Sequence, residues 1–188
     1  MSLGTRSFEP SDDLGDRLGE PSSFSMPAPR DLTGSTAWER AQTERDDGGP
    51  INDAERMVSL SGSEWPHRVT FALRGRTLVA DCDCDGWRYH DFCAHVASLW
   101  WQWVRGEIIV RHLDTGRDYP EPPCWLSLDD PPGRTAYDHL TPAELDAYLT
   151  CHLGGVGNRE FADFSGRSAG TVGNLLGRAR DKLGGERR

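Results

Sequence analysis

The chain has 188 residues, of which 36% are hydrophobic, and a formal net charge of −9. This length suits one or two small domains, and no stretch approaches the roughly 20 consecutive apolar residues of a membrane-spanning helix. Met1 to Glu20 also lack the basic start and apolar stretch of an export signal, so we expect a cytoplasmic protein that does not contact membranes. Five cysteines cannot all pair within the chain, and in a reducing compartment metal binding becomes the leading reason for clustered cysteines.

Residues 1–50 predict a disordered acidic tail. Ser, Gly and Pro are frequent there, acidic residues outnumber basic ones, and no helical or strand-like apolar period persists. Such a segment cannot bury enough apolar surface to offset the entropy that it would lose on folding. At most, we expect a short helix around Ala37 to Arg45.

Residues 51–113 predict a small module made of a β-hairpin and a helix. His67 to Leu73 and Thr77 to Cys82 are β-prone runs on either side of an Arg-Gly-Arg turn. The helix that follows ends at Gly106. Its buried stripe consists of apolar residues at helical spacing: Phe92, Val96, Leu99, Trp100 and Trp103.

Residues 114–137 are interrupted by five prolines and predict a linker, which we expect to wrap the module through Trp125. Residues 138–188 predict an all-α region. Its first helix begins at a capping box with proline in the first helical position, Thr141-Pro142-Ala143-Glu144. A shorter helix is expected from Arg159 to Phe164.

Three cysteines and one histidine follow the pattern Cys-x-Cys, eight residues, Cys-x-His: Cys82, Cys84, Cys93 and His95. Tetrahedral zinc takes four ligands of these types. The first pair ends a predicted strand and the second lies in the first turn of the predicted helix, so one structural Zn²⁺ would clamp hairpin and helix together. His90 is an alternative to His95, whereas Cys124 and Cys151 stand alone in the sequence.

This arrangement resembles the SWIM zinc finger, in which a β-hairpin, Cys-x-Cys, a variable gap, Cys-x-His and a helix follow one another. The likeness covers roughly Trp65 to Arg105. The resemblance implies a finger that binds either DNA or proteins. A structural or protein-binding role is favoured here, because four aspartates around the predicted site would repel a phosphate backbone: Asp81, Asp83, Asp85 and Asp91.

The last helix opens at Ser168 after a turn that contains Gly166, which completes a helix-turn-helix pattern. From Leu140 to Leu183 the chain resembles region four of bacterial sigma factors of the extracytoplasmic-function type. The resemblance implies that the last helix enters the major groove of duplex DNA. The residues that we expect to contact DNA are Arg167, Ser168, Thr171, Asn174, Arg178, Arg180 and Lys182.

Two departures from that family limit the comparison. Gly173-Asn174 stands where a basic or polar pair is usual, and Arg167 replaces an apolar residue. Nothing upstream resembles the sigma region that melts promoter DNA and grips the polymerase, so we do not expect a complete sigma factor.

The sequence therefore predicts an α+β protein with a zinc-binding regulatory function, in which the C-terminal helix-turn-helix binds double-stranded DNA. The alternative is a zinc-dependent adaptor that touches no DNA and docks on RNA polymerase or another protein. In that case the basic C-terminal residues form a solvated helix face or a protein-binding bundle. We do not expect an enzyme, because the chain has no P-loop, dinucleotide fingerprint, nucleophile elbow or open-site zinc triad.

Overall fold

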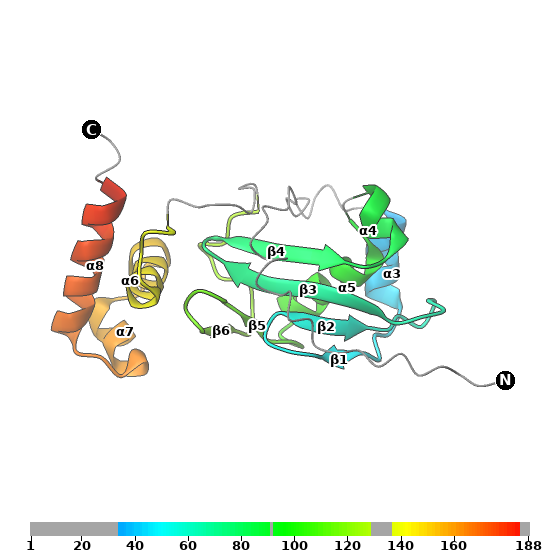
Figure 1. The fold of residues 1–188 in the computed structure, drawn as a ribbon. Coiled ribbons are helices and arrows are strands. Elements are labelled where there is room, and N and C mark those ends of the chain that lie inside the picture. The colour runs from blue at the N-terminus through cyan, green and yellow to red at the C-terminus, as the bar shows by residue number, and fades with distance from the viewer. Residues whose placement is uncertain (1–33, 91, 129–136, 185–188) are drawn as a thin grey trace.

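The computed structural model describes residues 34–90, 92–128 and 137–184. These residues form a mixed α and β fold with a four-stranded antiparallel sheet in the order β1-β2-β3-β4 and a smaller sheet of β5 and β6. The described part of the chain also contains helices α3 to α8 and one π-helix, η1. Figure 1 shows the four-stranded sheet in the centre, with α3 and α4 at one end and α6, α7 and α8 at the other.

The central hairpin pairs the two strands that the sequence predicts. Strand β3 (His67–Arg74) runs antiparallel to β4 (Thr77–Cys82), and Gly75 in the turn has a φ of +58°, which a side chain would disfavour. The two remaining strands, β1 (Gly49–Pro50) and β2 (Glu55–Val58), extend the sheet on the β3 side.

Ordered structure begins before residue 50. Helix α3 (Thr36–Thr43) matches the short helix expected around Ala37 to Arg45, and the side chain of Ser35 caps its first turn. Ala41 is buried and Trp38 packs edge-on against Trp101 with ring centroids 5.6 Å apart. The prediction of a disordered tail is therefore wrong for residues 34–50, because the apolar side chains of this single helix find a partner in the distant helix α5. Residues 1–33 lie outside the described part of the chain.

Helix α5 (Ala94–Val104) is the centre of the main core. It starts two residues after the predicted stripe begins, and Val96, Leu99 and Trp103 are fully buried. The Trp103 ring meets Phe71 of β3 edge-on at 5.9 Å, which fastens the helix to the sheet. This packing confirms the part of the predicted stripe that lies in α5, whereas Phe92 precedes the helix and is only partly buried.

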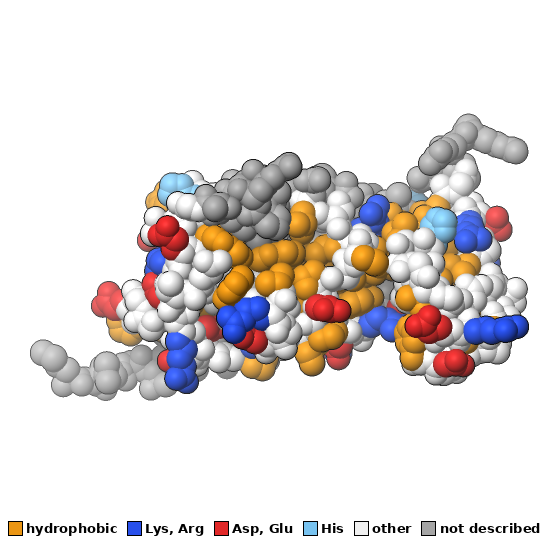
Figure 2. Space-filling model, turned by 180° about the vertical axis from the view of Figure 1, so that it is seen from behind, with side chains coloured by type: hydrophobic (Ala, Val, Ile, Leu, Met, Phe, Trp, Pro, Cys, Tyr) orange, Lys and Arg blue, Asp and Glu red, His pale blue; other side chains and the backbone are white. Residues whose placement is uncertain are grey.

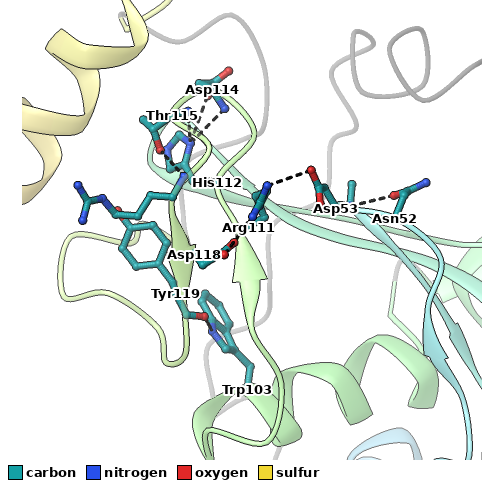
Figure 3. A network of polar contacts seen from close by, with 11 residues as sticks. Asn52, Asp53, Trp103, Arg111, His112, Asp114, Thr115, Asp118 and Tyr119 are labelled. Atoms are coloured by element: carbon teal, nitrogen blue, oxygen red, sulfur yellow. Dashed lines mark hydrogen bonds and ion pairs between the residues drawn. The ribbon is translucent and has the colours of Figure 1, made fainter. Parts of the chain in front are cut away.

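The segment after α5 folds back on the module. Strands β5 (Val110–Arg111) and β6 (Asp118–Tyr119) form a short hairpin, and Trp103 Nε1 donates a hydrogen bond to the carbonyl oxygen of Tyr119 at 2.9 Å. Figure 3 shows this contact together with Arg111, which lies between Asp118 and Asp53.

The predicted linker is only partly described. Trp125 is buried, as expected, and the amide of Ser127 donates to the carbonyl oxygen of Arg76, so residues 114–128 pack on the module. Residues 129–136 of the predicted linker lie outside the described part of the chain.

The C-terminal region contains four helical segments: α6 (Pro142–Ala147), η1 (Tyr148–Leu153), α7 (Asn158–Ser165) and α8 (Ala169–Gly184). The capping box at Thr141 and Glu144 is confirmed, because each side chain accepts a hydrogen bond from the backbone amide of the other residue. After Ala147 the α-helix continues directly as the π-helix η1. A second core forms between α7 and α8, around Phe161 and Val172.

Leu145 and Leu149 do not belong to that second core. Both are buried in the main core with the sheet and α5, so α6 faces the sheet module. An ion pair fixes the same junction: Arg117 donates to both carboxylate oxygens of Asp146 at 2.7 Å. The Arg117 guanidinium also lies over the ring of Phe161, at 5.2 Å from its centroid.

No helix in the described ranges combines the length and apolar character that a membrane crossing would need.

Replacement of Trp103 by Phe tests the role of α5. The smaller ring leaves a void against Phe71 and removes the hydrogen bond to Tyr119, so we expect a loss of about 2–4 kcal/mol in the free energy of unfolding. Trp65→Phe is the matched control, because Trp65 is 64% exposed. Chemical denaturation measures both, and equal costs for the two variants would contradict this role of Trp103.

Candidate metal centre

The four residues predicted as zinc ligands lie together in the structure. Their ligand atoms are all within 4.8 Å of one another: the Sγ atoms of Cys82, Cys84 and Cys93 and a ring nitrogen of His95. All four side chains are buried, and Cys82 Sγ lies 3.8 Å from His95 Nδ1. Four converging donors of this kind could hold one metal ion.

Local backbone structure explains how the four donors converge. Cys82 is the last residue of β4, and Cys84 follows in the turn that leads into α4 (Asp85–His90). Cys93 is the N-cap of α5, and His95 lies in its first turn. Because α5 packs on the sheet through its apolar face, its N-terminus is held beside the end of β4.

The sequence did not indicate helix α4, which forms one wall of the site. The amide of Trp87 donates a hydrogen bond to Cys84 Sγ at 3.3 Å. At Gly86 a Cβ would lie 3.4 Å from the Cβ of Cys93, at the limit of ordinary van der Waals contact, so the start of α4 lies directly beside the start of α5. A six-residue helix carries too little periodic signal to be predicted, and Gly86 in the gap between the cysteine pairs is the one available hint.

Protons in the cluster are shared among the thiols. Hydrogen bonds from the thiols of Cys82 and Cys93 hold the pKa of Cys84 far below its usual range. The pKa of Cys82 is raised because its own thiol donates to its neighbours Cys84 and Cys93 and is buried. A metal ion that binds all three sulfurs must displace the protons of these thiols.

The alternative ligands lie elsewhere. His90 is exposed and outside the cluster, so among the described residues His95 is the histidine that completes it. Cys124 is exposed and Cys151 is half-buried, and neither joins the four. All five cysteines are free thiols, so no disulfide competes for the donors.

The residues predicted to contact DNA lie on and just before α8, but they do not form one uniform basic surface. Ser168, Thr171 and Asn174 are exposed, and Ser168 Oγ accepts the amide hydrogen bond of Thr171 at 3.0 Å. Arg180 points to the other side of the helix, where it approaches His152 Nδ1 at 3.4 Å.

The other three basic candidates make ion pairs within the protein. Arg178 Nε and Lys182 Nζ both bind the carboxylate of Glu144, at 3.1 and 2.6 Å. Arg167 lies 3.8 Å from Asp146. Glu144 and Asp146 are buried, and the sequence did not predict these ion pairs, because the capping role of Glu144 gave no sign that α8 would cover it.

Comparisons with protein family models, with curated proteins and with solved structures gave no match to this chain.

Removal of one ligand tests the metal site. We expect the purified protein to carry one metal ion per chain and Cys93→Ser to lose it, with a marked loss of thermal stability, since structural zinc can contribute on the order of 10 kcal/mol. Cys151→Ser should keep the ion, because Cys151 lies outside the cluster. Elemental analysis and thermal unfolding provide the readouts, and equal metal content in both variants would contradict the assignment.

The buried carboxylate of Glu144 predicts a pH dependence of stability. Hydrogen bonds, first from Lys182 and then from the backbone amide of Thr141, lower the pKa of Glu144 from 4.5 to about 2. Because the folded pKa lies below the unfolded one, its contribution is complete above about pH 4.5 and is lost as the pH falls toward 2.

Glu144→Gln should therefore flatten the stability profile over that range and cost about 1.5–3 kcal/mol at pH 7. Glu160→Gln, the same change at an exposed site on α7, serves as the control. Denaturant midpoints between pH 2 and 7 measure the effect, and parallel profiles for Glu144→Gln and the wild type would refute it.

Proposed function

We propose that this protein is a zinc-binding regulator, in which a SWIM-type finger carries a C-terminal helix-turn-helix that binds double-stranded DNA. The observation that carries the metal part is the buried Cys82, Cys84, Cys93 and His95 cluster. Three thiolates and one imidazole are the donor set of a closed, tetrahedral zinc site. Four protein ligands leave no position for a substrate, so the zinc is structural and the protein acts by binding rather than catalysis, in the cytoplasm where thiols remain reduced.

The DNA-binding part of the proposal rests on the exposed row on α8. Ser168, Thr171 and Asn174 present hydroxyl and amide groups, which can hydrogen-bond to phosphates and base edges. Gly166 has a φ of +67° at the turn between α7 and α8, which permits the sharp change of direction of a helix-turn-helix. In this arrangement Arg178 and Lys182 would share their charge with Glu144, and Arg180 lies beside His152 rather than in the exposed row.

A second candidate function, a zinc-dependent protein adaptor, is favoured by the ion pairs of Arg167, Arg178 and Lys182. These pairs reduce the positive potential available to DNA in a chain of net charge −9. Figure 2 shows apolar side chains gathered across the middle of one face, with charges of both signs around them. Such a face would suit a protein partner, for which RNA polymerase is the first candidate.

Fluorescence anisotropy of the zinc-loaded protein with a pool of labelled duplexes, at two salt concentrations, tests the proposal. We expect saturable binding that weakens with salt, and a roughly tenfold loss of affinity in Asn174→Glu, which sets a negative charge on the exposed row of α8. Arg178 is a poor target, because its replacement also removes a partner of the buried Glu144.

Tyr89→Glu is the matched control. It introduces the same charge at a 74% exposed position on α4, at the opposite end of the molecule from α8 (Figure 1). Affinity within twofold of wild type is expected for this variant. Absence of saturable binding at low salt would overturn the DNA contact and favour the adaptor, whose direct binding to purified RNA polymerase can then be measured with the same variants.

A further inference from the structure

The imidazole of His95 has contacts on both of its ring nitrogens, and only one of them faces the thiols. Its Nδ1 atom faces Cys82 Sγ, and its Nε2 atom lies 3.3 Å from the hydroxyl oxygen of Ser63. The ring of His67 lies against it, with centroids 4.4 Å apart and the two planes tilted by 41°. Ser63 belongs to the loop between β2 and β3, more than thirty positions before His95 in the chain.

Helix α3 in turn holds that loop. Arg40 Nη2 donates to Ser63 Oγ at 3.1 Å, and the same guanidinium makes a forked ion pair with Glu44. Glu44 Oε2 also accepts the amide hydrogen bond of Gly62 at 2.9 Å. A continuous chain of hydrogen bonds therefore runs from the end of α3 through Ser63 to the imidazole.

Close packing makes the position of Ser63 specific. A Cβ on Gly62 would lie 2.7 Å from Glu44 Oε1. The absence of a side chain at this position therefore lets the loop lie close to the carboxylate. The amides of Ser61 and Ser63 are bound as well, to the carbonyl oxygens of Arg45 and Leu60. Ser63 Oγ thus stands at a fixed point between Arg40 and His95.

The two contacts of the ring lie at its two nitrogens, Nδ1 toward Cys82 and Nε2 toward Ser63. If Nδ1 binds a metal, the proton of the neutral ring lies on Nε2 and is donated to Ser63 Oγ. That oxygen has two lone pairs, so it can accept from His95 and from Arg40 together. Outer hydrogen bonds of this type orient a ligating imidazole and raise its basicity.

The charge of the site also favours a cation nearby. Three thiolates and a divalent ion leave a buried centre with a net charge of −1, which is costly without nearby positive charge. The pKa of Arg40 is raised mainly by its hydrogen bond to Glu44, and the thiols of Cys84 and Cys93 add to this effect. The guanidinium therefore lies within the electrostatic field of the cluster.

We propose that helix α3 is the outer shell of the metal centre: Ser63 positions His95, and Arg40 with Glu44 positions Ser63, so that the seating of α3 controls how tightly the metal is held. This inference rests on the proposed zinc site. It assigns a function to a segment outside the finger motif, and it makes metal retention depend on a short helix near the N-terminus.

Metal affinity of the full-length protein tests the proposal. Zinc affinity is measured by competition with a chelator, and Co²⁺ absorption reports the tetrahedral site. We expect Ser63→Ala and Arg40→Ala each to weaken zinc binding about 10- to 100-fold with the one-ion stoichiometry preserved, whereas Ser63→Thr, which keeps a hydroxyl, should bind within threefold of wild type.

Matched controls lie close by in the chain. Ser61→Ala changes an exposed serine two positions away in the loop, and Arg45→Ala removes an exposed ion pair with Asp47. Both should bind zinc like the wild type. NMR of the ring nitrogens gives a second readout: the His95 Nε2 proton should be protected from exchange in the zinc-loaded wild type and exposed in Ser63→Ala, even if the two proteins are equally stable.

The outcomes separate this inference from the proposed function. A wild-type protein that binds no zinc or Co²⁺ overturns both. A wild-type protein that binds one ion, with affinities for Ser63→Ala and Arg40→Ala equal to those of their controls, leaves the metal site intact and overturns the role of α3.

Discussion

The packing of α5 against the β3–β4 hairpin is the contact on which the rest of the structure depends. The first turn of this helix supplies Cys93 and His95 to the metal cluster, and its middle fills the core. Its last turn carries Trp103, which holds β5 and β6 through the Tyr119 carbonyl. One helix of eleven residues thus joins the cluster, the sheet and the hairpin that leads to the C-terminal region.

A series of packed side chains and ion pairs connects the Cys82, Cys84, Cys93 and His95 cluster to the C-terminal helices. From Trp103 the path leads to the β5–β6 hairpin and then to Arg117, whose guanidinium binds Asp146 and covers the rings of Phe161 and Phe164. In the proposed regulator, a clamp at one end would therefore fix the orientation of α7 and α8 at the other. Both charges at this junction are largely removed from water, where a well-formed pair is specific in geometry.

Sequence reasoning located features whose signal is local. The Cys-x-Cys pair and the Cys-x-His pair predicted all four residues of the cluster. Thr141 and Glu144 predicted the start of α6. It failed where the partner is distant: Trp38 and Ala41 gain their burial from α5, and nothing near them in the chain shows this. Arg178 and Lys182 illustrate the same limit. The sequence predicts that these basic side chains are available to DNA, because it does not show that the fold brings the buried carboxylate of Glu144 beside them. The resemblances to the SWIM finger and to sigma region four remain predictions.

The position of α6 bears on how this chain can be divided. Leu145 and Leu149 contribute to the core of the sheet module, whereas Ala147 faces the second core, so one short helical stretch serves two hydrophobic interiors. A fragment cut just before α6 would expose two leucines and separate Asp146 from Arg117. The C-terminal helices are therefore not an interchangeable cassette, and a recombinant or evolutionary exchange of this region would have to carry the matching surface of the β5–β6 hairpin with it.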